Sequence, residues 1–160
     1  MATKEDLVPM QVRVVLPTSS GSAVFLGNEE KTFVIYVDQS VGAAITMFMR
    51  GVQKERPLTH DLIGSIFAGL GVRLTRVVIS DLKNSTFFAQ LYLVCENELG
   101  KKILQVDARP SDSIALALQS KCPVFVARHV FDVVDDMSEV LRKMSEAQAE
   151  GEEESGGEEK

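Results

Sequence analysis

The segment Asp107–Leu118 reads DARPSDSIALAL and joins an extended stretch to an apolar helix through an Arg-Pro pair. Lys101–Asp107 is predicted as a strand, and Ser111–Gln119 as a helix that is apolar almost all round and therefore buried on several sides. Proline presets φ at the first helical turn, and Ser111 is a residue type that favours helix N-caps. We therefore expect a strand, a sharp turn and a central helix here.

A second Arg-Pro helix start lies at Arg56–Leu62, which reads RPLTHDL. Thr59 is a natural N-cap, and Asp61 stands in the first turn, where a carboxylate contributes roughly 0.3–1 kcal/mol against the helix dipole. Gly71 is expected to close this helix. Its apolar stripe consists of Leu58, Leu62, Ile63, Ile66, Phe67 and Leu70.

The other elements follow from hydrophobic periodicity and turn residues. Strands are predicted at Met10–Leu16, Ala23–Gly27, Lys31–Val37, Val72–Leu82, Thr86–Cys95 and Val124–Val126, and helices at Val41–Met49, between Ser40 and Gly51, and at Met137–Ala149. Strands outnumber helices and come in antiparallel groups. We expect a single α+β domain: a mixed, largely antiparallel β-sheet with three or four helices packed on it.

Charge divides the chain into a neutral body and an acidic end. Ser145–Lys160 holds seven glutamates and one lysine, which accounts for the whole net charge of −6. We expect an N-terminal arm over residues 1–9, the domain over 10–144 and an acidic disordered tail over 145–160. A neutral body is a weak platform for a long phosphate backbone, although an oligomer could pool its basic patches.

Cellular location is indicated by what the sequence lacks. No apolar run approaches the roughly 20 residues of a membrane span, and residues 1–7 do not resemble a secretory signal. Cys95 and Cys122 sit in apolar surroundings and form no CxxC motif, so free thiols in a reducing compartment are expected. We predict a cytoplasmic protein with no membrane association.

Candidate catalytic groups cluster at the two Arg-Pro starts, and the chain contains no P-loop, GxGxxG, GxSxG or HExxH motif. Metal-assisted phosphodiester hydrolysis uses carboxylates to hold Mg²⁺ or Mn²⁺, arginine to stabilise phosphate charge and a general acid or base such as histidine. The matching groups are Asp61, Asp107 and Asp112 as metal ligands, His60 as acid or base, and Arg56 and Arg109 as phosphate-binding residues. The alternative is that these aspartates cap helices and pair with the arginines, which would stabilise the fold without catalysis.

The same segments resemble the signature blocks of the bifunctional nuclease family. The resemblance rests on Arg56–Leu62 and Asp107–Leu118, with Val77–Ile79, Thr86–Leu91 and Cys122–Val126 beside them, and covers roughly Val12–Val130. It implies hydrolysis of both DNA and RNA, with His60, Asp61, Asp107, Arg109 and Asp112 as site residues.

One stretch departs from the family pattern. In Tyr36–Ala43, Val41 takes the place of a glutamate that the resemblance implies, and Asp38 takes the place of a glycine. A lost metal ligand favours the alternative of a non-catalytic binding or regulatory module that retains the fold. Side chains rich in Met and Phe (Met47, Phe48, Met49 and Phe67) further suggest a homodimer or higher homo-oligomer, although core packing explains them equally well.

Overall fold

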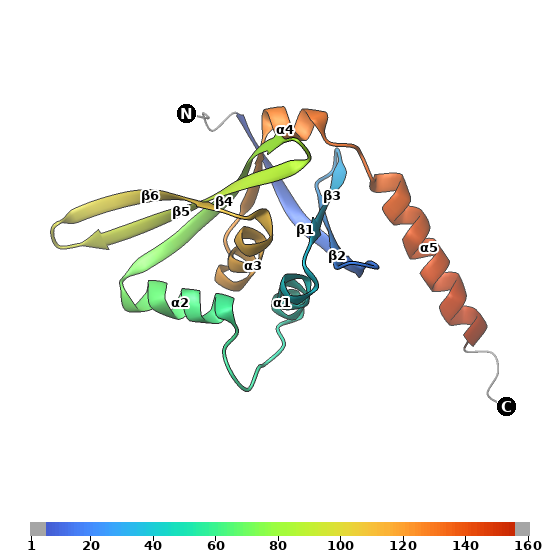
Figure 1. The fold of residues 1–160 in the computed structure, drawn as a ribbon, viewed down its shortest axis with the longest axis horizontal. Helices are drawn as coiled ribbons and strands as arrows, with labels where there is room; N and C mark the ends of the chain where they lie inside the picture. Colours follow the sequence, from blue (N-terminus) through green and yellow to red (C-terminus); the bar gives the residue numbers. More distant parts are fainter. Residues whose placement is uncertain (1–5, 156–160) are drawn as a thin grey trace.

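The strands form one mixed sheet in the computed structural model, which describes residues 6–155 (Figure 1). The strands are β1 (Leu7–Pro17), β2 (Ser22–Gly27), β3 (Thr32–Val37), β4 (Val72–Lys83), β5 (Thr86–Asn97), β6 (Gly100–Ala108) and β7 (Val124–Ala127). The helices are α1 (Gln39–Arg50), α2 (Thr59–Gly69), α3 (Pro110–Ser120), α4 (Arg128–Val133) and α5 (Ser138–Ser155). The predicted α+β class is confirmed, with α4 as a short helix that the sequence pattern did not indicate.

The sheet has the strand order β3-β2-β1-β7-β4-β5-β6. Every neighbouring pair is antiparallel except β4 and β7, which are parallel because α3 carries the chain from the edge strand β6 back to the centre. Strand β1 pairs with β7 through Leu7–Met10 and, next to a bulge between Val12 and Val14, with β2 through Gln11–Pro17. Residues 7–9, predicted as part of an arm, therefore belong to a central strand, while residues 1–5 lie outside the described part.

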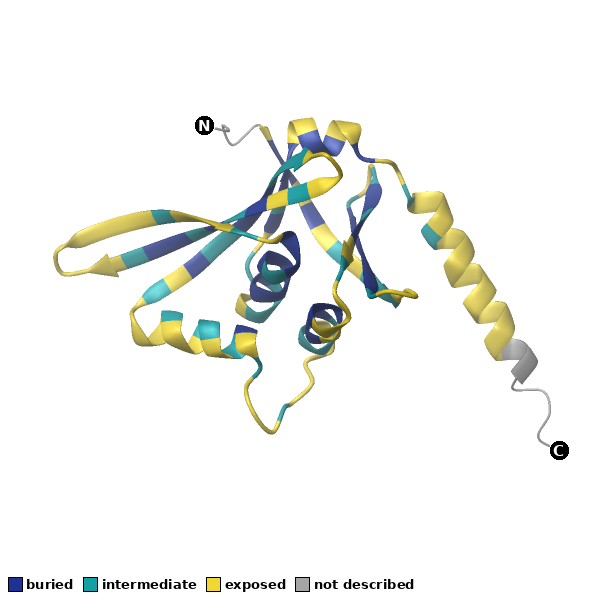
Figure 2. Ribbon diagram, viewed as in Figure 1, coloured by how far each residue is buried: buried dark blue, intermediate teal, exposed yellow. Residues whose placement is uncertain are grey.

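Helix α3 is the centre of the core. Helices α1, α2 and α3 lie on the same side of the sheet, with α3 in the middle (Figure 1). Ile114 and Ala115 pack into the cluster that β1, β2 and β3 line, whereas Leu116 and Ala117 pack into a second cluster on β4 and β5. Helix α3 is mostly buried in Figure 2, which confirms the interpretation of its all-round apolar sequence.

The helix starts lie one or two residues before the predicted caps. Asp38, rather than Ser40, is the N-cap of α1, while Leu58 and Arg109 precede α2 and α3 in extended conformation. The backbone N–H of Leu58 donates to Asp61 Oδ2 at 2.7 Å, so the aspartate three residues on takes over the capping role predicted for Thr59. Gly51 ends α1 in the left-handed region, as predicted.

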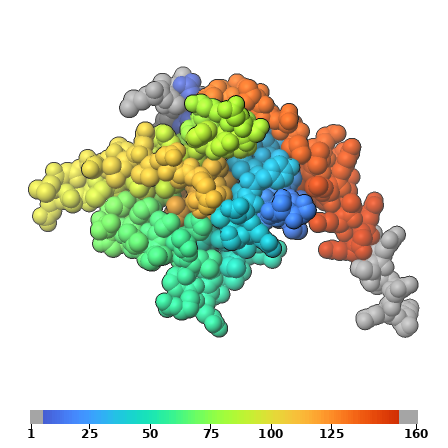
Figure 3. Space-filling view, in the orientation of Figure 1, coloured from blue at the N-terminus to red at the C-terminus, as the bar shows by residue number. Residues whose placement is uncertain are grey.

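Helix α5 projects away from the body, opposite the β5–β6 hairpin (Figure 3). It continues to Ser155, whereas composition predicted disorder from residue 145. Arg142 pairs with Glu139 at 3.7 Å and with Glu146 at 2.9 Å, and such pairs at helical spacing stabilise an exposed helix. Residues 156–160 of the predicted tail lie outside the described residues.

Two further findings bear on the environment of the chain. No helix within residues 6–155 combines the length and the apolar character needed to cross a membrane. Cys95 and Cys122 are free thiols, and burial raises the pKa of Cys122 to about 11, which makes this thiol unreactive.

Candidate functional site at the start of helix α3

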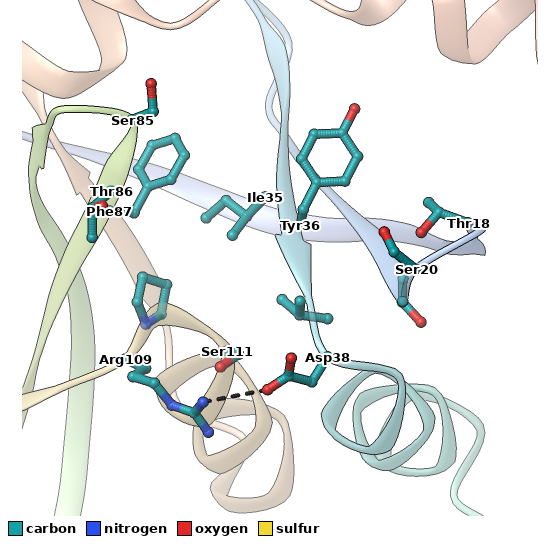
Figure 4. Close-up of a pocket in the computed structure, with 14 residues that line it drawn as sticks. Thr18, Ser20, Ile35, Tyr36, Asp38, Ser85, Thr86, Phe87, Arg109 and Ser111 are labelled. Atoms are coloured by element: carbon teal, nitrogen blue, oxygen red, sulfur yellow. Dashed lines mark hydrogen bonds and ion pairs between the residues drawn. The ribbon is translucent and has the colours of Figure 1, made fainter.

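The starts of α1 and α3 meet at Arg109. Its Nε donates to Asp112 Oδ2 at 2.9 Å. Its Nη1 lies 3.4 Å from Asp38 Oδ2 at the start of α1, the contact drawn in Figure 4. The hydrogen bond and charge of Asp112 raise the pKa of Arg109, so the guanidinium is always charged. One exposed arginine is therefore shared by two carboxylates from different helices.

His60 joins the same group from the start of α2. Its side chain is buried, and its Nε2 lies 2.9 Å from Asp112 Oδ1. Because an ionised carboxylate can only accept a hydrogen bond, this contact places the proton on Nε2. Gln119 of α3 donates to the backbone oxygen of His60 at 2.8 Å, and the Phe48 ring lies edge-on at 6.4 Å, so the imidazole is held from several sides.

Asp112 contacts both Arg109 and His60. Burial by itself would raise the pKa of Asp112, but hydrogen bonds from Arg109 and His60 and their charges outweigh it and hold the pKa below the ordinary 3.8. Asp112 is therefore an anion at neutral pH. A carboxylate with so low a pKa is a poor proton acceptor, so its chemistry is that of an orienting and charge-stabilising group.

Asp61 caps the start of its own helix, α2. Its Oδ2 accepts from the N–H of Leu58 and pairs with Lys54 Nζ at 3.3 Å, and Lys54 also lies over the Phe48 ring. Burial acts to raise the pKa of Asp61, yet the Leu58 and Lys54 contacts hold it below its usual value. The structure thus agrees with capping and ion pairing for this carboxylate, which were the alternative to metal binding.

Asp107 faces away from His60 and Asp112. In the β5–β6 register Asp107 is opposite Gln90, and directly opposed residues in an antiparallel pair share one face of the sheet. The next residue, Leu91, packs against Leu116 of α3, so Gln90 and Asp107 lie on the other face. The sequence placed Asp107 and Asp112 in one cleft; the alternation of side chains along β6 separates them. Arg56 lies exposed in the loop before α2.

The predicted metal centre does not assemble. Among residues 6–155 no three His, Cys, Asp or Glu side chains form a group that could hold a metal ion. Asp61 caps α2, Asp107 lies on the opposite face of the sheet, and Asp112 is bound to Arg109 and His60. The three carboxylates therefore do not fit a shared metal site, and a metal requirement stays a prediction.

A hydroxyl-rich cavity of about 520 Å³ adjoins Arg109 and Asp38. Its polar lining comes from the β1–β2 turn, the β4–β5 turn and the start of α3 (Thr18, Ser20, Ser22, Ser85, Thr86 and Ser111), and Tyr36 and Phe87 add aromatic walls (Figure 4). Such a cavity offers several neutral hydrogen-bonding groups beside one cation. Apart from Asp38, Arg109 and the expected N-cap Ser111, the lining residues were not candidates in the sequence, because isolated hydroxyl residues in turns carry no spacing signal.

Position 41 contributes nothing polar to the site. Val41 is buried and packs into the core cluster with Ile45. The carboxylate that faces Arg109 from α1 is instead Asp38, three residues earlier. Of the two departures noted in the sequence, Val41 therefore belongs to the core and Asp38 belongs to the site.

Fold and site together define an α+β domain in which three helix starts, two of them with an Arg-Pro pair, bring an arginine, a histidine and two carboxylates together. A family model described as the bifunctional nuclease domain matches residues 24–138. The chain belongs to the bifunctional nuclease domain family, as the resemblance of its two Arg-Pro segments indicated.

Individual relatives range from an uncharacterized bacterial protein to plant nucleases. An uncharacterized protein of Mycobacterium tuberculosis is 41% identical over 103 residues, which is 64% of this chain and 58% of that protein. Bifunctional nuclease 2 of Arabidopsis thaliana is 27% identical over 114 residues, covering 68% of this chain and 34% of the plant protein. Bifunctional nuclease 1 of rice (Oryza sativa subsp. indica) is 24% identical over 118 residues, covering 73% of this chain and 33% of its own length. The chain thus spans about half to one third of these relatives.

Proposed function

We propose that this protein hydrolyses phosphodiester bonds in DNA and RNA at the group formed by Asp38, His60, Arg109 and Asp112. The observation that supports it best is the convergence of His60 and Arg109 on the two oxygens of Asp112, each at 2.9 Å, from helix starts about 50 residues apart. The family match and the plant relatives named as nucleases point to the same chemistry.

In this proposal Arg109 binds the scissile phosphate and stabilises the charge that develops on it. Asp112 holds the guanidinium in place and fixes the tautomer of His60, and His60 acts as the general acid or base. Arg109 faces two carboxylates, so with a neutral His60 the group carries a net charge of −1. The contacts with these carboxylates use only Nε and Nη1 of the exposed guanidinium, so a phosphate can bind its other N–H groups or displace Asp38, whose contact is the longer one.

The proposal is tested by cleavage of fluorescently labelled single-stranded DNA and RNA. We expect the wild-type chain to shorten both, and the Asp107→Ala, Asp112→Ala double variant to be inactive. Asp107→Ala alone should retain activity because Asp107 lies on the opposite face from His60. Activity that survives in the double variant would point to a contaminant. Parallel reactions with Mg²⁺, Mn²⁺ or EDTA decide the metal requirement predicted from the sequence.

The alternative is a binding or regulatory module without catalysis. It is favoured by the neutralisation of Arg109 by two carboxylates and by the apolar Val41. Binding of the same substrates without cleavage under any metal condition would support this alternative against the nuclease.

Self-association is also part of the proposal, through a different surface from the one predicted. Phe48 and Phe67 pack against the core clusters, whereas Leu62 and Ile66 of α2 and its C-cap residue Leu70 are 54%, 50% and 69% exposed. They are spaced four residues apart and form one apolar stripe. We expect a homodimer in light scattering at micromolar concentration and a monomer for Ile66→Glu. A monomeric wild-type chain would exclude this proposal.

The free thiols fit the predicted cytoplasmic location.

A further inference from the structure

A second polar cavity, of about 950 Å³, lies on the face of the sheet that α3 does not cover. Tyr92 is opposite Arg76 on one side and Gln105 on the other, so these three side chains share a face. The alternate residues Leu91 and Leu93 pack toward α3 on the other face. The cavity is therefore separate from the Arg109 site, and its side walls are α4 and the start of β1.

The cavity contains a cation–π stack of an arginine over a tyrosine ring. The guanidinium carbon of Arg76 lies 4.2 Å from the centre of the Tyr92 ring. This distance is that of a cation–π contact, and nucleic-acid bases stack on both arginine and aromatic side chains. Gln90 and Gln105 stand beside the stack, and each amide can both donate and accept hydrogen bonds at a base edge.

The lining of this cavity carries two arginines and two aspartates, and Arg128 also lies over the Phe131 ring. Within the described residues, Arg76 and Arg128 form no ion pair with a carboxylate, although Asp6 and Asp132 also line the cavity. His129 is directed to Asp81 at 3.4 Å. This differs from the catalytic candidate, where two carboxylates already occupy Arg109. Among residues 6–155, neither arginine forms an ion pair that an anionic group would have to break.

We propose that this cavity binds a nucleotide unit, with its base stacked on Arg76 and its phosphate at Arg128. The stack, the two amides and the two guanidinium groups, which form no ion pair within residues 6–155, together match a flat heterocycle that carries an anion. The nucleotide comes either from a single-stranded substrate or from a free mononucleotide. The first source rests on the proposed nuclease function and would extend the strand contacts beyond Arg109.

The test measures binding separately from cleavage. Fluorescence anisotropy of a labelled 12-nucleotide oligothymidylate in EDTA, with its length checked on a gel, reports strand binding by the full chain. We expect Arg76→Gln and Arg128→Gln each to weaken binding about 10-fold, and Arg128→Gln to reduce the salt dependence by about one counterion. Arg13→Gln is the matched control, since Arg13 is an exposed strand arginine outside this cavity, and it should bind as the wild type does.

A second arm distinguishes the source of the nucleotide. Adenosine and thymidine monophosphates are titrated into the ¹⁵N-labelled chain, and shifts of the Gln90 and Gln105 side-chain amide signals locate the site. Shifts with the mononucleotides and no binding of the oligothymidylate assign the cavity to free nucleotides. Binding of the oligothymidylate that depends on Arg76 and Arg128 assigns it to a strand.

Two results would overturn the inference: neither probe binds, or the two cavity variants bind like Arg13→Gln while their melting curves match the wild type. Its failure is distinguishable from failure of the nuclease proposal. If the wild type cleaves but the cavity variants bind normally, the nuclease proposal stands and the cavity inference fails. If the cavity binds nucleotide but the wild-type chain never cleaves, the cavity inference stands and the nuclease proposal fails.

Discussion

Asp112→Asn is expected to reduce the rate of nucleic-acid cleavage by about 100-fold or more, the range for loss of an acid–base group or its orientation. One carboxylate oxygen accepts from Arg109 and the other from His60. An asparagine offers only one acceptor, and its NH₂ group would face one of two donors. Either Arg109 or His60 then loses its partner. Initial cleavage rates on labelled single-stranded DNA measure the effect.

Asp38→Asn is the matched comparison because it also removes a carboxylate from Arg109. The Asp38 contact is longer, at 3.4 Å, and the Asp38 side chain is 73% exposed, so the pair is worth at most about 1 kcal/mol. Its loss should free Arg109 and lower KM a few-fold with little change in kcat. A large loss of kcat in Asp38→Asn equal to that in Asp112→Asn would contradict the assigned roles.

A pH series separates an effect on folding from one on catalysis. The pKa of Asp112 is lower in the folded chain than the ordinary 3.8, so its charge stabilises the fold above that value. The stabilisation is lost as pH falls through the folded-state pKa. The difference in free energy of unfolding between wild type and Asp112→Asn should therefore be constant near neutrality and shrink in acid. A catalytic defect at neutral pH with native secondary structure then reports on the site itself.

The fold could be predicted further than the site, and the reason is periodicity. The apolar runs of β4 and β5 and the all-round apolar α3 each carry a pattern that only one type of element satisfies. The first residues of β1 were missed because Pro9 interrupts the run before Met10, yet pairing with β7 holds them in the sheet. Composition also predicted disorder from residue 145. The structure instead has a helix there, and Arg142 supports it through ion pairs with Glu139 and Glu146.

The site required information that a single sequence lacks. Proximity in sequence put Asp107 and Asp112 in one cleft. Strand side chains alternate between the two faces of a sheet, and Asp107, paired with Gln90, lies on the face that α3 does not cover. The pairing of His60 with Asp112 depends on how α2 and α3 lie against each other, which no local pattern encodes. Asp38 could be singled out only as a departure from the family pattern, and its contact with Arg109 became evident when the two helix starts were placed together.

Gly42→Ala is expected to destabilise the protein by about 1–3 kcal/mol, the usual cost of overpacking. Gly42 lies in α1, where the helix touches β2, and a methyl group there would come within 2.5 Å of the Ser22 Cβ and still nearer to its hydroxyl. Both atoms belong to a buried strand residue that cannot move aside. For a chain of this size the loss corresponds to a fall in Tm of about 3–10 °C, measurable by circular dichroism.

Gly69→Ala is the matched control, because it is also a helical glycine but has no atom within 4 Å of the added methyl. It should leave Tm unchanged or raise it slightly through helix propensity. Ser22→Gly in the Gly42→Ala background should restore most of the loss, since it removes both atoms in the clash.

Gly42→Ala is also expected to affect the site, because the N–H of Gly42 bonds to the carbonyl of Asp38 at 2.9 Å. Displacement of α1 would therefore draw Asp38 away from Arg109, and in Gly42→Ala the KM should move in the same direction as in Asp38→Asn.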